Sequence, residues 1–185
     1  MKRGLIAATT LFFILLSLII SVRGRSMDLQ SFQTTRDTSP TGPYEGSNST
    51  SRLALTEAIV DHQTFFLTSQ QAKFASPDVS KYKDRYLSLF PPGVSLLGAP
   101  FFLLGKLLSV PQIIAYLSVA LTALINVILI TLLSRRLGAS LPASLLSSTT
   151  FLFATNALSY SSTYTQHHAT SMVLLLTLLL VNSRL

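Results

Sequence analysis

The sequence predicts an all-α membrane protein: a polytopic helical bundle with a large external first loop that carries juxtamembrane helices. Two observations lead to this prediction. The 185 residues are 49% hydrophobic and 11% charged, with a mean hydropathy of +0.50, which is too apolar for a soluble core of this size. Every acidic residue lies between positions 28 and 84, and long apolar stretches flank that segment. Lipid is therefore the expected solvent for most of the chain.

The formal net charge is +7, and many of the basic residues stand at the ends of apolar stretches. Basic residues in such places orient membrane spans, so the charge predicts contact with membrane lipid and no nucleic-acid partner. The chain contains no cysteine, which excludes disulfides, thiolate metal sites and a cysteine nucleophile.

The first apolar stretch runs from Leu5 to Val22, behind Lys2 and Arg3. As a helix rising about 1.5 Å per residue, it nearly matches the hydrocarbon core of a bilayer. A cleaved signal peptide is the alternative, but the sequence after the stretch lacks a small-x-small cleavage site. We therefore expect residues 1–22 to form an uncleaved signal anchor with a cytoplasmic amino terminus.

Residues 111–185 are expected to form a bundle of about three transmembrane helices. Ile113 to Leu133 is uncharged throughout and is the clearest span. Leu137 to Leu158 and Thr170 to Val181 are the other two predicted spans. Asn126 is isolated within the clearest span, so we expect it to form a hydrogen bond between helices.

The stretch from Gly93 to Leu108 decides the topology. It contains glycine, proline and a lysine, and if it crossed the membrane Arg135 and Arg136 would share a side with the large loop. The positive-inside rule argues against that arrangement. We therefore expect an interfacial helix here, an external loop over residues 23–110 with amphipathic and interfacial helices, and location in the plasma membrane.

Within this loop, the pattern from Ser51 to His62 predicts an amphipathic helix. Arg52 opens it, where a forked guanidinium and unpaired helix N–H groups can hold a phosphate; pairing with a nearby loop acid is the alternative. Glu57 and Asp61 are one turn apart, close enough to share a metal or for one to raise the pKa of the other. The alternative is a solvated polar face.

Two further groups are candidates for binding a substrate. Lys83 and Arg85 alternate with tyrosines and can bind a lipid phosphate, or they can form an ordinary interfacial belt. His167 and His168 fall in the second predicted external loop. Because adjacent histidines on a helix point in different directions, one of them facing a cavity is expected rather than a two-histidine metal site.

The order of these features resembles the amino-terminal part of the C-type-fold (GT-C) glycosyltransferases. That group includes protein O-mannosyltransferases and lipid A aminoarabinose transferases. The resemblance rests on the signal anchor, the loop helix from Asn48 to His62, the Pro91-Pro92-Gly93 sequence before an interfacial helix, and Arg135-Arg136 after the second span. It covers most of the chain, although each motif is short.

The resemblance implies an enzyme that transfers a sugar from a polyprenyl-phosphate donor to an acceptor on the external membrane face. It also implies an acidic base just before the loop helix, where this sequence has Asn48-Ser49-Thr50 and the nearest acid upstream is Glu45. The catalytic candidates are thus Glu45, Glu57 and Asp61. The substrate-binding candidates are Arg52, Lys83, Arg85, His167 and His168. A divalent metal ion is the cofactor that the resemblance allows, with no ligands assigned.

Members of the family continue for more spans, whereas this chain stops at Leu185. We therefore expect an amino-terminal portion, with a partner chain supplying the remaining spans. The alternative is a catalytically inactive membrane fragment or scaffold that pairs with a separately encoded partner or binds lipid.

Overall fold

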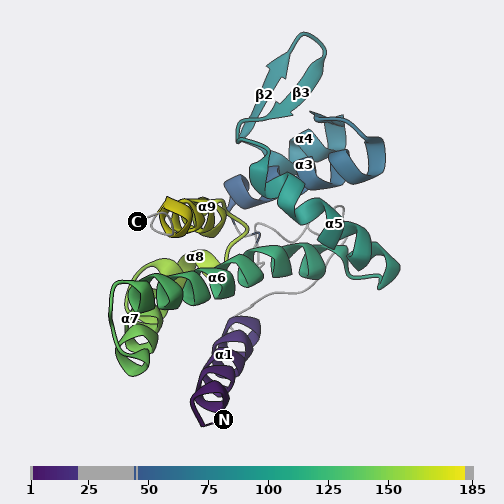
Figure 1. Ribbon diagram of the computed structural model, residues 1–185. Helices are drawn as coiled ribbons and strands as arrows, with labels where there is room; N and C mark the ends of the chain where they lie inside the picture. Colours follow the sequence, from purple (N-terminus) through teal and green to yellow (C-terminus); the bar gives the residue numbers. More distant parts are fainter. Residues whose placement is uncertain (1, 21–43, 45, 182–185) are drawn as a thin grey trace. The chain divides into compact units, whose positions relative to one another are not determined.

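The computed structural model describes residues 2–20, 44 and 46–181, and these residues are mostly helical, as predicted (Figure 1). They form two compact units. The helical unit contains α1 (Lys2–Ile20), α6 (Pro111–Arg136) from Ala120 onward, α7 (Leu141–Phe153), α8 (Ala157–Ser161) and α9 (His167–Val181). Among the described residues, the sheet unit contains those from Tyr44 to Val119 in the first part of α6, together with the short segment Thr163–Gln166.

Helix α6 has 26 residues, which at about 1.5 Å per residue exceeds the roughly 30 Å hydrocarbon core of a bilayer. It ends at Arg136, and Gly138 shortly after it has a φ of 91°, in the left-handed region. The backbone N–H of Ala139 closes the end by donating to the carbonyl of Ser134 at 3.0 Å. By length and composition, α6 is the one described helix that can cross a membrane.

The other apolar helices among the described residues are shorter, so the polytopic bundle stays a prediction. A continuous span from Leu137 to Leu158 is wrong. Helix α7 begins only after Ser140, whose Oγ accepts a hydrogen bond from the N–H of Ala143 at 3.4 Å, and it ends at Phe153 before the short α8. Asn126 does join two helices as predicted, since its Nδ2 donates to the carbonyl of His168 on α9 at 2.9 Å.

The sheet unit is built around α3 (Ser47–His62), which packs against α4 (Ser69–Ala75) and α5 (Gly93–Leu107). The predicted loop helix is thus present, but it begins four residues before Ser51. The predicted helix over Gly93 to Leu108 is also present as α5. Apolar side chains remain exposed along the far side of α5: Leu96, Leu103, Leu104 and Leu107.

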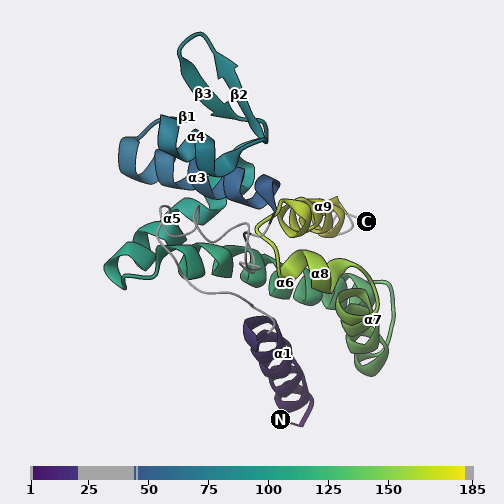
Figure 2. The same cartoon turned by 180° about the vertical axis from the view of Figure 1, so that it is seen from behind.

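A three-stranded antiparallel sheet makes the expectation of an all-α chain wrong. The strands are β1 (Phe66–Leu67), β2 (Val79–Tyr82) and β3 (Arg85–Ser88), in the order β1-β3-β2. Each strand has only two to four residues, too few for a recognisable alternating pattern. Within the sheet unit, the β2–β3 hairpin lies on the side of α3 away from α5, as both views show (Figure 1, Figure 2).

Candidate functional site

The site centres on Arg52, which lies in the second turn of α3 and is only 1% exposed. An amphipathic helix with Arg52 on its polar face is therefore wrong for this part of α3. Residues Ser49 to Thr56 are buried on every side of the helix, because α4, α5 and the sheet all pack against it. The expectation that Arg52 opens the helix is wrong as well, since the helix begins at Ser47.

Neutral oxygen atoms hold the guanidinium of Arg52. Its Nη1 donates to the backbone carbonyl of Asn48 at 2.9 Å and to the Asn48 Oδ1 at 2.7 Å, and its Nη2 donates to the Oε1 of Gln166. The guanidinium carbon lies 3.9 Å from the ring centroid of Phe90. The buried Nε has no hydrogen-bond partner among the described residues.

Burial lowers the pKa of Arg52, while the nearby Asp78 and Tyr164 act in the opposite direction. A guanidinium nevertheless stays protonated in proteins, so the site carries a positive charge. Between residues 46 and 181, the structure records no salt bridge to Arg52. A buried charge is costly unless an opposite charge or a full set of hydrogen bonds compensates it. The site is therefore suited to an anion that can reach the guanidinium.

Gln166 reaches Arg52 because the neighbouring Tyr164 is anchored in the core of the sheet unit. The Tyr164 Oη lies 3.0 Å from the Oγ1 of Thr56 and donates to the carbonyl of Val94 at 3.3 Å. Burial raises the pKa of Tyr164 to about 12, so the phenol stays neutral. The ring also contacts Tyr44, with 5.4 Å between the two centroids. Within the segment Thr163–Gln166, Tyr164 is thus buried and held in place, whereas Gln166 is exposed.

Among the described acidic residues, Asp78 is the one whose charge acts on the pKa of Arg52, and sequence reasoning missed it. Its Oδ2 accepts a hydrogen bond from the Oγ of Ser47 at 2.7 Å. Its backbone carbonyl accepts one from the Oγ of Ser51 at 2.8 Å. These contacts fix the residue before β2 against the first turn of α3. The polar segment that contains Asp78 has no periodic pattern of apolar residues, so nothing in the sequence distinguished this acid from its neighbours.

Of the predicted catalytic acids, the described Glu57 and Asp61 do not lie around Arg52. Glu57 is half-buried and hydrogen-bonded to Gln71, and burial is the main reason that its pKa is raised. Asp61 pairs with Lys106 of α5, at 2.5 Å between Oδ1 and Nζ. At about 100° per residue, both acids point to other sides of α3 than Arg52 does. Glu45 lies outside the described residues.

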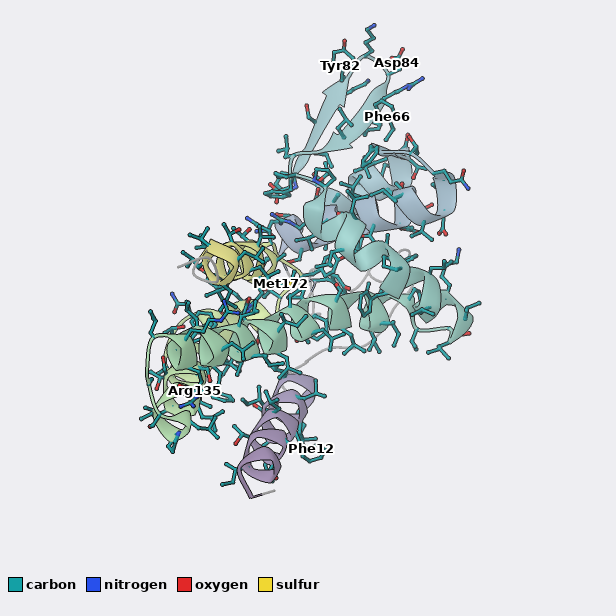
Figure 3. The ribbon with its side chains drawn as sticks, viewed as in Figure 1. Phe12, Phe66, Tyr82, Asp84, Arg135 and Met172 are labelled. Atoms are coloured by element: carbon teal, nitrogen blue, oxygen red, sulfur yellow. The ribbon has the colours of Figure 1, made fainter. Side chains whose placement is uncertain are left out.

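Lys83 and Arg85 are exposed and lie on the β2–β3 hairpin, on which Figure 3 labels their neighbours Tyr82 and Asp84. The Nζ of Lys83 is 5.5 Å from the ring centroid of Tyr82. The guanidinium carbon of Arg85 is 4.6 Å from the ring centroid of Phe66. The hairpin therefore has its own cationic and aromatic surface.

The two predicted histidines belong to the helical unit. His167 stacks on Tyr160, with 3.9 Å between ring centroids. His168 is buried, with its Nδ1 3.1 Å from the Nδ2 of Asn126 and its Nε2 2.8 Å from the carbonyl of Ala157. This pairing suits a neutral imidazole that accepts at Nδ1 and donates at Nε2. His168 thus joins α6, α8 and α9.

Among the described residues no three His, Asp or Glu side chains gather at one place, so no ligands are assigned to the divalent metal that the resemblance allowed. Comparison with protein-family models, with curated proteins and with solved structures gives no match.

Proposed function

We propose that this chain is a membrane glycosyltransferase, or the amino-terminal part of one, that moves a sugar from a polyprenyl-phosphate donor to an acceptor on the external membrane face. One observation carries the proposal. Arg52 is a buried cation whose hydrogen-bond acceptors among the described residues are all neutral oxygens, and its Nε has no partner there. In this proposal the donor phosphate is the missing anion.

In the proposal a phosphate pairs with the edge of the guanidinium formed by Nε and Nη2. Two phosphate oxygens can accept from these atoms in a bidentate pair, with the exposed Gln166 side chain displaced from Nη2. Hydrogen bonds to charged groups contribute about 1.5–3 kcal/mol each, more than the neutral contact that Gln166 provides. Asn48 and Phe90 keep the guanidinium in place meanwhile.

The proposed reaction is a single displacement at the anomeric carbon of the donor sugar. The acceptor hydroxyl oxygen forms the new bond, the bond from the sugar to the phosphate breaks, and the polyprenyl phosphate leaves with the electron pair. The hydroxyl proton passes to a carboxylate, for which Glu45 and Asp78 are the candidates. Arg52 stabilises the negative charge that builds up on the departing phosphate.

The apolar helices agree with a donor that is a lipid. In the proposal α6 crosses the plasma membrane, while α5 lies in its outer interface with its exposed leucines in the lipid. Polyprenyl chains would then reach the sheet unit from the bilayer without entering water.

A second function, binding of a polyprenyl phosphate without transfer, is favoured by the arrangement of the acids. Glu57 contacts Gln71 and Asp61 contacts Lys106, so two of the three predicted catalytic carboxylates already have partners in the fold. A scaffold of this kind keeps the Arg52 site and lacks a base. Transfer of labelled sugar by the purified full-length chain separates the two functions.

The substitution Gln166→Glu tests the phosphate site without loosening the fold. It places a carboxylate against the guanidinium, so we expect the melting temperature of the protein to rise because the buried charge gains a counter-ion. The same carboxylate competes with phosphate. We therefore expect binding of polyprenyl phosphate to weaken by about tenfold or more, measured on full-length protein in lipid nanodiscs.

Gln70→Glu is the matched control, because it adds the same charge at an exposed position on α4 of the same unit. It should leave phosphate binding unchanged. The polyprenol without its phosphate should bind the wild type and Gln166→Glu equally. Undiminished binding of the phosphate by Gln166→Glu, in a protein whose melting temperature has risen, contradicts the proposal.

A further inference from the structure

The β2–β3 hairpin presents an outer sheet face, which we define as Phe66, Ser80, Tyr82, Arg85 and Leu87. These side chains share one face because directly paired residues of an antiparallel sheet point the same way. The register pairs Tyr82 with Arg85, and Leu87 with both Ser80 and Phe66. The whole set thus projects from one side of the sheet.

The opposite face of the sheet is the one that packs on the helices. Leu67 and Tyr86 are paired on that inner face, and Leu67 is 5% exposed. Ser88 is there too, with its Oγ 2.8 Å from the Oγ of Ser51 on α3. The outer sheet face is therefore turned away from α3, and its Tyr82 side chain is 60% exposed (Figure 3).

Cations alternate with aromatic rings along this face. Arg85 lies over the ring of Phe66, and Lys83 at the hairpin turn lies over the ring of Tyr82. Asp84 is the single acid on the hairpin against the three cations Lys81, Lys83 and Arg85, so the hairpin carries a net charge of +2. An exposed aromatic surface with an excess of positive charge indicates a partner that is flat and anionic.

Lipid headgroups and acidic carbohydrates both have the required charge, and the placement of the hairpin favours carbohydrate. The exposed leucines of α5 form an apolar surface on the sheet unit, and the hairpin lies on the other side of α3 (Figure 2). With α5 against a bilayer, the outer sheet face points into the aqueous phase. Its natural ligand is then a soluble anionic polymer.

We propose that the outer sheet face, together with Lys83, binds an anionic glycan. The rings of Phe66 and Tyr82 can pack against the C–H faces of pyranose rings, while Arg85 and Lys83 pair with carboxylate or phosphate groups on the same chain. As the acceptor class of the transfer, this assignment rests on the proposed function. The binding itself does not require catalysis.

The test measures binding of polygalacturonate oligosaccharides to the full-length protein in detergent, with dextran as the neutral probe. The double variant Tyr82→Ala, Arg85→Gln should bind polygalacturonate about tenfold or more weakly than the wild type. Both positions are exposed, so melting temperatures should agree. The matched control, Phe65→Ala with Lys73→Gln, removes one exposed ring and one exposed cation elsewhere in the unit and should bind normally.

Two outcomes overturn the proposal. One is equal affinity of the wild type and the hairpin variant for polygalacturonate. The other is a hairpin-dependent interaction with vesicles containing phosphatidylglycerol and none with polygalacturonate, which would identify the ligand as lipid.

Failure of this proposal is distinguishable from failure of the proposed function. The hairpin variant should bind polyprenyl phosphate as the wild type does, and Gln166→Glu should bind polygalacturonate as the wild type does. The two kinds of binding are measured separately, so a result that contradicts one proposal leaves the other standing.

Discussion

Glu57 shows how one carboxylate of α3 responds to burial. Gln71 of α4 is hydrogen-bonded to it, and the ionisable groups around it are Asp61, His62 and Lys106. Burial is the largest cause of its raised pKa, and the charge of Asp61 adds to it. The hydrogen bond from Gln71 and the charges of His62 and Lys106 oppose this rise without cancelling it.

A raised pKa in the folded state means that the folded protein holds the Glu57 proton more tightly than the unfolded chain does. The stabilisation from protonated Glu57 is complete below the unfolded pKa and is lost as the pH rises through the folded pKa. We therefore expect Glu57→Gln to raise the melting temperature at pH 7. The difference should disappear below about pH 4, where the wild-type carboxyl is also neutral.

Thermal unfolding of both proteins across the pH range checks this prediction. Asp84→Asn, which neutralises an exposed carboxylate on the hairpin, is the control for net charge. A Glu57→Gln protein that is less stable than the wild type at pH 7 would show that the ionised carboxylate holds the fold together.

At the scale of single residues, the sequence identified Arg52 as an anion-binding candidate but none of the side chains around it. The reason is that a sequence shows which side chains are charged but does not show which neutral side chains the fold brings into contact with them. Gln166 is 114 positions away from Arg52, and the hydrogen bond between them depends on the tertiary fold. Asn126 was identified because a lone amide in an apolar stretch needs a partner in any helical packing.

Among the structural elements, α5 and the segment Thr163–Gln166 meet at a contact that requires glycine. A Cβ added to Gly98 would lie 1.8 Å from the Oη of Tyr164 and 3.0 Å from its ring carbon Cζ. Tyr164 cannot retreat easily, because Thr56, Val94 and Tyr44 surround it. The glycine therefore sets how closely the segment approaches α5.

We expect Gly98→Ala to lower the stability of the protein by about 1–3 kcal/mol through overpacking. It should also change the binding of polyprenyl phosphate, because the displaced segment carries Gln166. Tyr164→Phe removes the clashing oxygen, so the double variant should recover part of the stability. Denaturant unfolding of the purified protein measures both effects.

Gly93→Ala is the control, since a Cβ at Gly93 meets nothing within 4 Å. This substitution in the first turn of α5 should be neutral or slightly stabilising. If Gly98→Ala is as stable as Gly93→Ala, Tyr164 does not approach α5 as closely as described.

The helices were easier to predict from the sequence than the strands. The positions of α3, α5 and α6 follow from apolar runs and from breakers such as Pro91-Pro92-Gly93 and Gly138. The sheet was missed because β2 and β3 consist largely of polar and charged residues, as suits a hairpin with one face in water. The break between α7 and α8 was missed although it contains the polar residues Thr155 and Asn156, because these two residues stand between apolar stretches.

For the molecule as a whole, the side of the membrane on which each part lies can be measured directly. The chain has no cysteine, so a single introduced one is labelled without background. Ser134 precedes Arg135 and Arg136 at the carboxyl end of α6, which the positive-inside rule places in the cytoplasm. Ser80 lies on the exposed hairpin of the predicted external loop.

We expect a membrane-impermeant maleimide to label Ser80→Cys in intact cells and Ser134→Cys only after permeabilisation. Permeabilised cells should show that both cysteines react. Labelling of Ser134→Cys from outside would overturn the predicted topology, and labelling of neither position before permeabilisation would place the sheet unit in the cytoplasm.

The segment Thr163–Gln166 belongs to the sheet unit, although the residues before and after it belong to the helical unit. Two separate stretches of the coding sequence therefore encode the sheet unit. Recombination that replaced only the first 119 residues would leave Arg52 without its matched Gln166, and Gly98 without its matched Tyr164. We expect substitutions at positions 52 and 166, and at 98 and 164, to have been accepted in pairs over the history of this protein.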